Sequence, residues 1–498
     1  MDILAHLISG FGVALTPTNL AIAFFGAFIG TAVGMLPGLG PINGVAILMP
    51  LAFAMNFPPE SALILLAAVY MGCEYGGRIS SILLNVPGDA GAIMTALDGN
   101  PLAKQGLAGV ALSMSAVASF CGAIIATIGI VFFAPLLASW ALSFGPAEYF
   151  ALMVFAIACL GGMVGDKPVK TLLATMIGLS LATVGVDANS GVYRFTFDDV
   201  HLADGIQFVV VVIGLFSVSE ILLMLEGTHA GQTLIKQTGR MMFNLREFRA
   251  TIGTMLRSSV MGFGIGVLPG AGATIASAIS YMTTKRLHPD KAFGEGEIRG
   301  VAAPEAANNA SACGSFIPML TLGVPGSGTT AVMIGALTLY NITPGPMLFE
   351  QQPDVVWGLI ASLFVANVVL LLLNIPLIRV FTRMLNTPLW ALVPGIAAVS
   401  AVGVYAVHAT TFDLILAVGL GVFGYILRKM DFPMSALILG FVLGEMLEQN
   451  LRRALSISNG DTAILLQSPI SVTLWILAVL ILIGPPLLRY FRRRKQAA

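Results

Sequence analysis

The stretch Gly34-Met35-Leu36-Pro37-Gly38-Leu39-Gly40-Pro41 interrupts a long apolar run, with residues 20–36 leading into it and residues 42–55 following it. Both flanking segments have the composition of membrane helices, because a spanning helix needs about 20 predominantly apolar residues. The prolines remove backbone donors and the glycines permit positive φ, so a continuous helix is not expected here. In lipid, such a break is tolerated only where it is buried in protein or lines a water-filled cavity.

Composition places the whole chain in the membrane class. Of its 498 residues, 57% are hydrophobic and 10% are charged, whereas soluble domains carry about 25% charged residues. The formal net charge is zero, so the expected surroundings are a lipid bilayer and no nucleic acid is expected as a partner. The four cysteines stand singly, without metal-ligand spacing, and are interpreted as small buried hydrophobes. The N-terminus lacks a basic region, so no removable signal peptide is expected.

The apolar pattern predicts two similar halves and an additional C-terminal helix. Repeat 1 covers residues 1–227, with a hairpin at 20–55, a broken helix at 61–99, and spans at about 106–134, 146–164, 169–187 and 205–226. Residues 228–251 form a cytoplasmic linker. Repeat 2 covers residues 252–450, with a hairpin at 252–284, a broken helix at 304–340, and spans at about 355–378, 389–405, 412–428 and 433–448. Residues 451–498 hold a last span at about 469–488 and a basic tail.

Sequence identities support the internal repeat. At an offset of 232 the matches are Gly30, Gly34, Leu36, Pro37, Gly38 and Gly40 with Gly262, Gly266, Leu268, Pro269, Gly270 and Gly272. At an offset of 238 they are Gly76, Ile79, Leu84, Val86, Pro87 and Gly88 with Gly314, Ile317, Leu322, Val324, Pro325 and Gly326. The first broken helix is predicted to break at Gly76-Gly77 and again at residues 85–89, and the second at residues 323–328. Paired Pro-Gly breaks in corresponding places indicate a duplicated unit and are typical of transporters.

Parity and charge predict that the two halves are inverted in the membrane. A hairpin makes no net crossing, whereas one broken helix and four spans make an odd number. Lysine and arginine favour the cytoplasmic side. With the C-terminus inside, 21 of the 25 lysines and arginines fall inside, Arg194, Arg452 and Arg453 fall outside, and Arg78 lies within a broken helix. We therefore expect the N-terminus outside and the C-terminus in the cytoplasm.

The four Pro-Gly breaks are expected to converge about a pseudo-twofold axis and to form a binding site. Half-helix N-termini suit a carboxylate, and half-helix C-termini and unwound carbonyls suit a sodium ion or a proton carrier. The alternative is that glycine and serine merely permit close helix packing, but proline adds nothing to packing. The candidate substrate-binding residues are Pro37, Gly38, Gly40, Asn43, Arg78, Ser81, Asn85, Gly88, Gly270, Gly272, Thr274, Pro325, Gly326, Ser327 and Thr329. The candidate sodium ligands are Asn85, Asp89, Asn308, Asn309, Ser311 and Thr330.

Charged residues in the two broken helices have alternative roles, since ionisable groups at membrane depth are functional candidates. Glu74 and Arg78 are spaced to pair with each other, or Arg78 binds a substrate carboxylate in a bidentate manner. Asp89 either caps the following helix or binds a cation. Glu305 lies nearer the cytoplasmic start of its element and is expected to cap a helix or to pair with Arg299.

Long motifs of this chain resemble the large membrane subunit of the tripartite tricarboxylate transporter family. They are residues 75–89, Tyr75-Gly76-Gly77-Arg78-Ile79-Ser80-Ser81-Ile82-Leu83-Leu84-Asn85-Val86-Pro87-Gly88-Asp89, and residues 95–99, 103–106, 34–41, 266–272, 304–310 and 323–330. Arg78 departs from the small polar residue expected in that family. The resemblance implies a bacterial inner-membrane importer of carboxylates, driven by an ion gradient, which would make the outer side, with the N-terminus, the periplasm. It also implies a small membrane subunit and a periplasmic substrate-binding protein. The hairpins and broken helices would form a mobile transport domain on a scaffold of the other spans.

The expected protein is therefore an all-α polytopic membrane protein with two inverted-topology repeats, each with a helical hairpin and a discontinuous helix. Its expected function is cation-coupled, elevator-type import of di- or tricarboxylates such as citrate, and assembly into a homo-oligomer stays open. A carboxylate channel, or a permease without a binding protein, is the alternative. The absence of GxxxxGK[ST], HExxH and GxSxG argues against ATP hydrolysis and against an enzyme. No cofactor is expected apart from the coupling sodium ion or proton.

Overall fold

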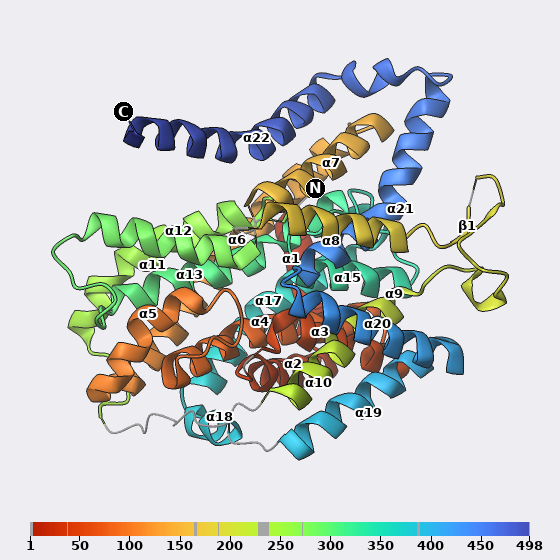
Figure 1. The fold of residues 1–498 in the computed structure, drawn as a ribbon. Coiled ribbons are helices and arrows are strands. Elements are labelled where there is room, and N and C mark those ends of the chain that lie inside the picture. The colour runs from red at the N-terminus through yellow and green to blue at the C-terminus, as the bar shows by residue number, and fades with distance from the viewer. Residues whose placement is uncertain are drawn as a thin grey trace.

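A computed structural model describes residues 3–36, 38–163, 167–187, 189–227, 239–270, 272–385 and 389–497. These residues are almost entirely helical (Figure 1). The strands among them are β1 (Gly185–Val186) and β2 (Tyr193–Arg194), which pair antiparallel. Within the described ranges, seven helices are long and apolar enough to cross a membrane, which confirms the all-α polytopic fold class. Pro37 and residues 228–238 of the predicted linker lie outside the described residues.

The first half holds the first hairpin, the first broken helix and four further spans. The hairpin is α2 (Pro17–Gly34) and α3 (Gly40–Ala54), preceded by an unpredicted α1 (Ile3–Ala14). The broken helix is α4 (Pro59–Leu84) and α5 (Ile93–Leu102), followed by the π-helical turn η1 (Ala103–Leu107). The spans are α6 (Ala108–Ala141), α7 (Pro146–Met163), α8 (Pro168–Leu181) and the continuous run α9 (Phe208–Val212), η3 (Ile213–Val218) and α10 (Ser219–Glu226). A 3₁₀ turn, η2 (Val200–Leu202), precedes that run.

The second half has the same order of elements. Its hairpin is α11 (Leu245–Gly266) and α12 (Gly272–Leu287). Its broken helix is α13 (Arg299–Gly314), α14 (Phe316–Leu322) and α15 (Gly328–Leu339). The later helices are α16 (Leu348–Gln351), α17 (Pro353–Asn374), α18 (Ile378–Met384), α19 (Leu389–His408), α20 (Thr411–Lys429), α21 (Met434–Ile457), η4 (Thr462–Leu466) and α22 (Pro469–Ala497).

The predicted break at Gly76-Gly77 is wrong, because α4 runs unbroken from Pro59 to Leu84. A Cβ atom on Gly76 would lie 2.7 Å from the backbone nitrogen of Met35, so the glycine lets the backbones of α2 and α4 approach closely. Small residues at a helix crossing serve this purpose in membrane proteins. Close packing of α2 on α4 explains Gly76, whereas a Cβ atom on Gly77 would meet the Asp89 carboxylate.

Matching backbone angles recur at the breaks of the two halves. Gly38 and Gly40 have φ of 89° and 61°, and their counterparts Gly270 and Gly272 have φ of 75° and 67°. At the offset of 238, the residue that follows α4 is Asn85 with φ 59°, and the residue that follows α14 is Gly323 with φ 69°. All six residues are in the left-handed region that favours glycine or asparagine. The repeated identities thus coincide with repeated conformations, whereas the inverted orientation in a membrane stays a prediction.

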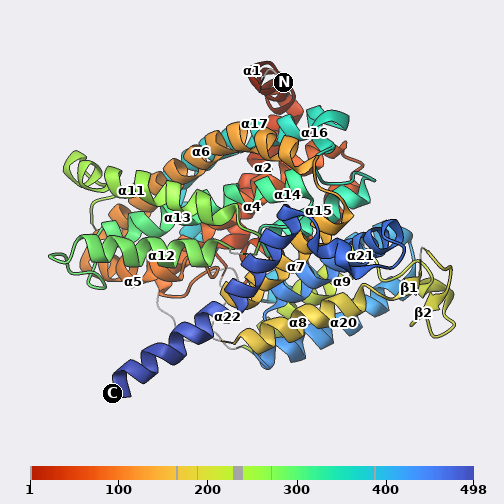
Figure 2. The same ribbon diagram turned by 90° about the horizontal axis from the view of Figure 1, so that it is seen from above.

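The helices form two groups on either side of the molecule. In both views α5, α11, α12 and α13 lie together on one side, and α8, α20 and α21 lie on the other (Figures 1 and 2). The contacts are reciprocal between the halves: α2 packs on α4 as α11 packs on α13, and α17 packs on α4 as α6 packs on α13. The broken helices α4 and α13 are buried along nearly their whole length. Together they form the centre of the group that contains α5, α11 and α12.

Asp98 joins the end of the first broken helix to the loop between α12 and α13. Its Oδ1 accepts hydrogen bonds from the backbone N–H groups of Gly294, Gly296 and Glu297, at 2.8, 3.0 and 2.8 Å. Its Oδ2 accepts one from the hydroxyl of Tyr281 at 2.9 Å. Asp98 is fully buried, so its carboxylate holds a second-half loop against a first-half helix.

Candidate functional site

Both hairpin tips and both helix breaks line one cavity of about 840 Å³, here called the central cavity. The first hairpin contributes residues 38–43 and the first break contributes residues 87–91. The second hairpin contributes Gly270 and residues 272–275, and the second break contributes residues 327–329. The sequence-based expectation that the breaks converge therefore has a direct structural counterpart.

Hydrogen bonds hold the hairpins and breaks against one another. The N–H of Gly270, at the tip of the second hairpin, donates to the carbonyl of Gly326 at 3.1 Å. The hydroxyl of Ser277, on α12, donates to the carbonyl of Gly91 at 2.9 Å, which joins the second hairpin to the first break. Tyr70, on α4, has its hydroxyl 3.3 Å from Oγ of Ser327. The first two bonds satisfy backbone groups freed at the breaks, as a membrane interior requires.

Three helices begin at glycines that line the central cavity. They are α3 at Gly40, α12 at Gly272 and α15 at Gly328. The first turns of a helix carry unpaired N–H groups and a partial positive charge, which attracts anions. The start of α15 is closed by a capping box, in which the Thr330 N–H donates to Oγ of Ser327 and the Ser327 N–H donates to Oγ1 of Thr330. The hydroxyl of Thr330 is thus engaged at the helix cap.

Asp89 and Asn43 each bring an uncommitted oxygen atom to the central cavity. Oδ1 of Asp89 accepts the N–H of Ala92 at 2.9 Å, as a capping residue does, whereas its Oδ2 is buried without a hydrogen-bond partner among the described residues. The amide of Asn43 donates to the carbonyl of Leu39, and its Oδ1 likewise has no partner there. Buried polar atoms are normally paired, so these two oxygens are candidate ligands for a cation or a hydrogen-bond donor.

Glu74 connects the cavity wall to the second broken helix. It lines the central cavity from α4, and its Oε2 accepts a hydrogen bond from Nδ2 of Asn308 on α13 at 2.8 Å. Oδ1 of Asn308 is buried without a partner among the described residues. The two broken helices are therefore joined by a polar contact directly behind the cavity.

Arg78 neither lines the central cavity nor pairs with Glu74. Its guanidinium donates to Oγ of Ser119 at 3.3 Å and to Oδ1 of Asn374 at 3.2 Å. It also lies over the Tyr75 ring, 4.7 Å from the centroid. In the described structure Arg78 is therefore held by the surrounding helices, away from the cavity.

The prediction for Glu305 is wrong, because α13 carries this residue into the fully buried centre of the protein. Its carboxylate accepts hydrogen bonds from Oγ1 of Thr95 at 2.6 Å and from Oγ of Ser119 at 2.9 Å. Ser119 thus stands between Glu305 and Arg78. Arg299 instead contacts Glu297 at 2.9 Å, since it lies near the start of α13 while Glu305 lies almost two turns further along.

The structure divides the predicted site residues into two sets. Those that line the central cavity are Gly38, Gly40, Asn43, Gly88, Asp89, Gly270, Gly272, Thr274, Ser327 and Thr329. Those outside its lining are Arg78, Ser81, Asn85, Asn308, Asn309, Ser311, Pro325, Gly326 and Thr330. In the second set, Ser81 bonds to the Gly77 carbonyl at 2.9 Å and Asn85 is exposed. Pro37 lies outside the described residues.

Sequence reasoning missed the opposite wall of the central cavity. This wall, called the scaffold wall below, consists of Leu160, Phe216, Arg428, Phe432, Met434, Ser435 and Leu439. It comes from α7, η3, α20, α21 and the connection between α20 and α21, all in plain spans without Pro-Gly breaks. The sequence held one signal for Arg428, which is its position just inside the end of an apolar span. Charge patterning uses this arginine only as an indicator of membrane topology.

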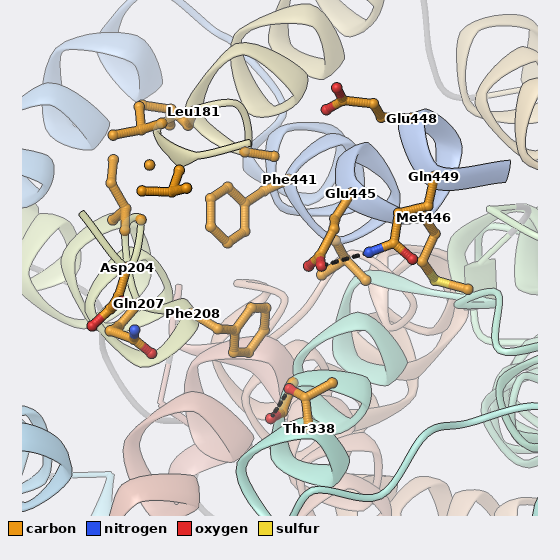
Figure 3. A pocket seen from close by; sticks show the side chains of 18 of the residues that line it. Leu181, Asp204, Gln207, Phe208, Thr338, Phe441, Glu445, Met446, Glu448 and Gln449 are labelled. Atoms are coloured by element: carbon orange, nitrogen blue, oxygen red, sulfur yellow. Dashed lines mark hydrogen bonds between the residues drawn. The ribbon is translucent and has the colours of Figure 1, made fainter. Parts of the chain in front are cut away.

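A second cavity of about 680 Å³ lies between α8, the β1–β2 loop, the end of α15, and α21 (Figure 3). Its lining holds four carboxylates, Asp187, Asp204, Glu445 and Glu448, against two guanidinium groups, Arg194 and Arg452. Both arginines are already paired with these acids, and the side chains of Glu445 and Gln449 bond to each other at 2.9 Å. The Asn189 N–H and Arg452 lower the pKa of Asp187 to about 2. This excess of negative charge disfavours a carboxylate ligand.

A polytopic helical protein with two broken helices and two hairpins around one cavity belongs to the class of membrane transport proteins. The chain belongs to the tripartite tricarboxylate transporter TctA family, whose model matches residues 20–439. It is therefore a membrane subunit of a tripartite tricarboxylate transporter.

Two relatives come from Agrobacterium vitis. One, described as an uncharacterized 52.8 kDa protein in the TAR-I ttuC' 3' region, is 41% identical over 476 residues, which cover 95% of this chain and 94% of the relative. The other, an uncharacterized protein in the TAR-II ttuC' 3' region, is 44% identical over 211 residues, which cover 42% of this chain and 87% of the relative. No solved structure matches the chain.

Proposed function

We propose that this chain is the large subunit of an importer that carries di- or tricarboxylates such as citrate across the bacterial inner membrane. A periplasmic binding protein delivers the anion, a small membrane subunit completes the complex, and a sodium or proton gradient drives uptake. The N-terminus lies in the periplasm and the C-terminus in the cytoplasm. One observation carries the proposal: both hairpin tips and both helix breaks line the same cavity.

The central cavity offers suitable groups for an anion and for a coupling cation. The N-terminal ends of α3, α12 and α15 suit the carboxylate groups of the substrate. Oδ1 of Asn43 and Oδ2 of Asp89 suit a sodium ion or, at Asp89, a proton. Among the described residues no group of three His, Cys, Asp or Glu side chains could hold a metal ion. In this proposal the Asp89 carboxylate binds a sodium ion together with amide and backbone oxygens, as at other broken membrane helices.

The packing supports an elevator-type motion with an altered division of the helices. The plain spans α6 and α17 pack on the broken helices α13 and α4, so they belong with the moving group rather than with the scaffold. The scaffold then consists of α7, α8, the α9–α10 run, α19, α20 and α21. The central cavity lies between the two groups, where a relative displacement would change its access from one side of the membrane to the other.

The proposal is tested by citrate uptake into vesicles that contain the complete transporter. We expect saturable uptake that requires the binding protein and an inward gradient of sodium ions or protons. Each gradient is imposed alone, which identifies the coupling ion. Uptake that is linear in citrate concentration and indifferent to the binding protein would instead favour a channel, and uptake that ignores both gradients would refute ion coupling.

A further inference from the structure

The scaffold wall of the central cavity is apolar except for Arg428 and Ser435. Among the described residues that line the cavity, Arg428 is the only lysine or arginine. The opposite wall carries the carboxylates of Glu74 and Asp89. A ligand with two or three negative charges therefore finds a fixed positive side chain on one side of the cavity only, at the end of α20.

The guanidinium of Arg428 is held by a carboxylate but is not saturated with hydrogen bonds. One terminal nitrogen forms an ion pair with Glu220 on α10. The other lies 3.5 Å from the carbonyl of Leu215, and Nε has no partner among the described residues. Only 17% of the Arg428 side chain and 7% of the Glu220 side chain are exposed. Arginine has five N–H donors, so this group retains capacity for a second carboxylate.

The Arg428–Glu220 pair also touches the first hairpin tip. A Cβ atom on Gly38 would lie 2.9 Å from Oε1 of Glu220, so the carboxylate lies directly against the tip backbone. The pair is thus placed where scaffold, hairpin and cavity meet.

The neighbouring pair, Lys429 with Glu226, provides a contrast. Its side chains are 47% and 46% exposed, and neither residue lines the cavity. Exposed ion pairs of this kind contribute little to the stability of a protein. The two ion pairs join adjacent residues of α20 to the same helix, α10. Of the two basic residues, Arg428 lines the cavity and Lys429 does not.

We propose that Arg428 binds a carboxylate group of the transported anion, and that Glu220 is the resident counter-ion with which the substrate competes. This inference rests on the proposed carboxylate transport and adds the residue that recognises the substrate from the scaffold. Guanidinium and carboxylate groups match in planar, bidentate geometry, so a substrate carboxylate is a suitable competitor for Glu220. Lysine, a compact point charge, would replace the arginine only in part.

The test measures citrate affinity of the complete transporter in nanodiscs by titration calorimetry. Arg428→Gln should weaken citrate binding by about 10- to 100-fold, the loss expected for a charged hydrogen-bonded partner. Arg428→Lys should fall between this variant and the wild type. Glu220→Gln should strengthen binding several-fold, because the guanidinium loses its competitor. Lys429→Gln is the matched control and should bind citrate as the wild type does.

The opposite directions of the two variants distinguish binding from a structural role. If the pair only stabilised the fold, Glu220→Gln and Arg428→Gln would weaken citrate binding alike, and that result would overturn the proposal. The double variant Glu220→Gln/Arg428→Gln contains no unpaired buried charge and should still bind weakly, which guards against a folding defect of the single variant. Wild-type affinity in Arg428→Gln would refute the role of Arg428 alone. A wild-type transporter that binds neither citrate nor succinate would refute the proposed function as well.

Discussion

Replacing Gly77 by alanine should displace the Asp89 carboxylate from the central cavity. Gly77 lies on α4 directly beneath the first break, and its carbonyl accepts the N–H of Gly88 at 3.3 Å. A Cβ atom added at Gly77 would collide with Oδ2 of Asp89 and would lie 3.0 Å from its Cγ. This oxygen is the one that the helix cap leaves unpaired. The substitution thus perturbs a candidate ligand without removing any polar group.

The expected size of the effect follows from the contact distances. Carbon atoms are at optimal separation at about 3.5–4.0 Å, so the Asp89 carboxyl group must move by about 0.5–1 Å or rotate. Adding a methyl group to a well-packed interior costs about 1–3 kcal/mol. If the substitution destabilises only the ligand-bound state by this amount, it lowers the affinity for the ligand that Asp89 contacts by about 5- to 150-fold.

The assay is citrate uptake as a function of sodium concentration and of pH, with Gly264→Ala as the matched control. Gly264 lies in α11, a helix of the second hairpin, and an added Cβ there meets nothing within 4 Å. Gly77→Ala should raise the concentration of sodium ions or protons needed for half-maximal uptake, and Asp89→Asn should do so further. Equal uptake curves for the Gly77 and Gly264 variants would refute the assignment of Asp89 as a coupling-ion ligand.

Three further predictions concern the site and its support. Asp98→Ala should lower the free energy of unfolding by about 3 kcal/mol, because it leaves buried donors unpaired, whereas Asp98→Asn should cost much less; thermal unfolding in detergent compares them, and equal losses would contradict the explanation. Asn43→Leu should reduce citrate uptake at least tenfold, whereas Asn367→Leu, which alters a similarly bonded asparagine outside the central cavity, should retain it; similar uptake in both variants would argue against a role for Asn43. A disulfide between cysteines at positions 42 and 435, which lie on opposite walls of the cavity, should form in a manner that depends on the ion gradient and should stop transport; cross-linking independent of the gradient would contradict the elevator motion.

Local covalent chemistry made the breaks predictable. Proline cannot donate a backbone hydrogen bond, and glycine adopts positive φ at little cost, wherever they occur in a chain. Residues 34–41 and 266–272 therefore predicted helix ends. In the structure these segments hold residues in the left-handed region, namely Gly38, Gly40, Gly270 and Gly272. Composition established the membrane class for the same reason, since the amount of apolar surface is a property of the residues themselves.

Contacts between distant segments were beyond the reach of such patterns. Gly76-Gly77 resembled a break by composition, but α4 continues through both residues, with α2 packed against Gly76 and the Asp89 carboxylate against Gly77. Glu305 was expected to cap a helix or to pair with Arg299, but the burial of α13 placed it beside Ser119 and Thr95.

The sequence by itself determined that this protein is a helical membrane protein of the tripartite tricarboxylate transporter family, interrupted at four Pro-Gly positions. Only the tertiary structure decided that Asn43 and Asp89 share a cavity with Arg428, whereas Arg78, Asn85 and Asn309 do not. The physical reason is that a break depends on the backbone of a few consecutive residues. A binding site depends on which side chains the packing of whole helices brings together, and the partners Glu220 and Arg428 are 208 residues apart.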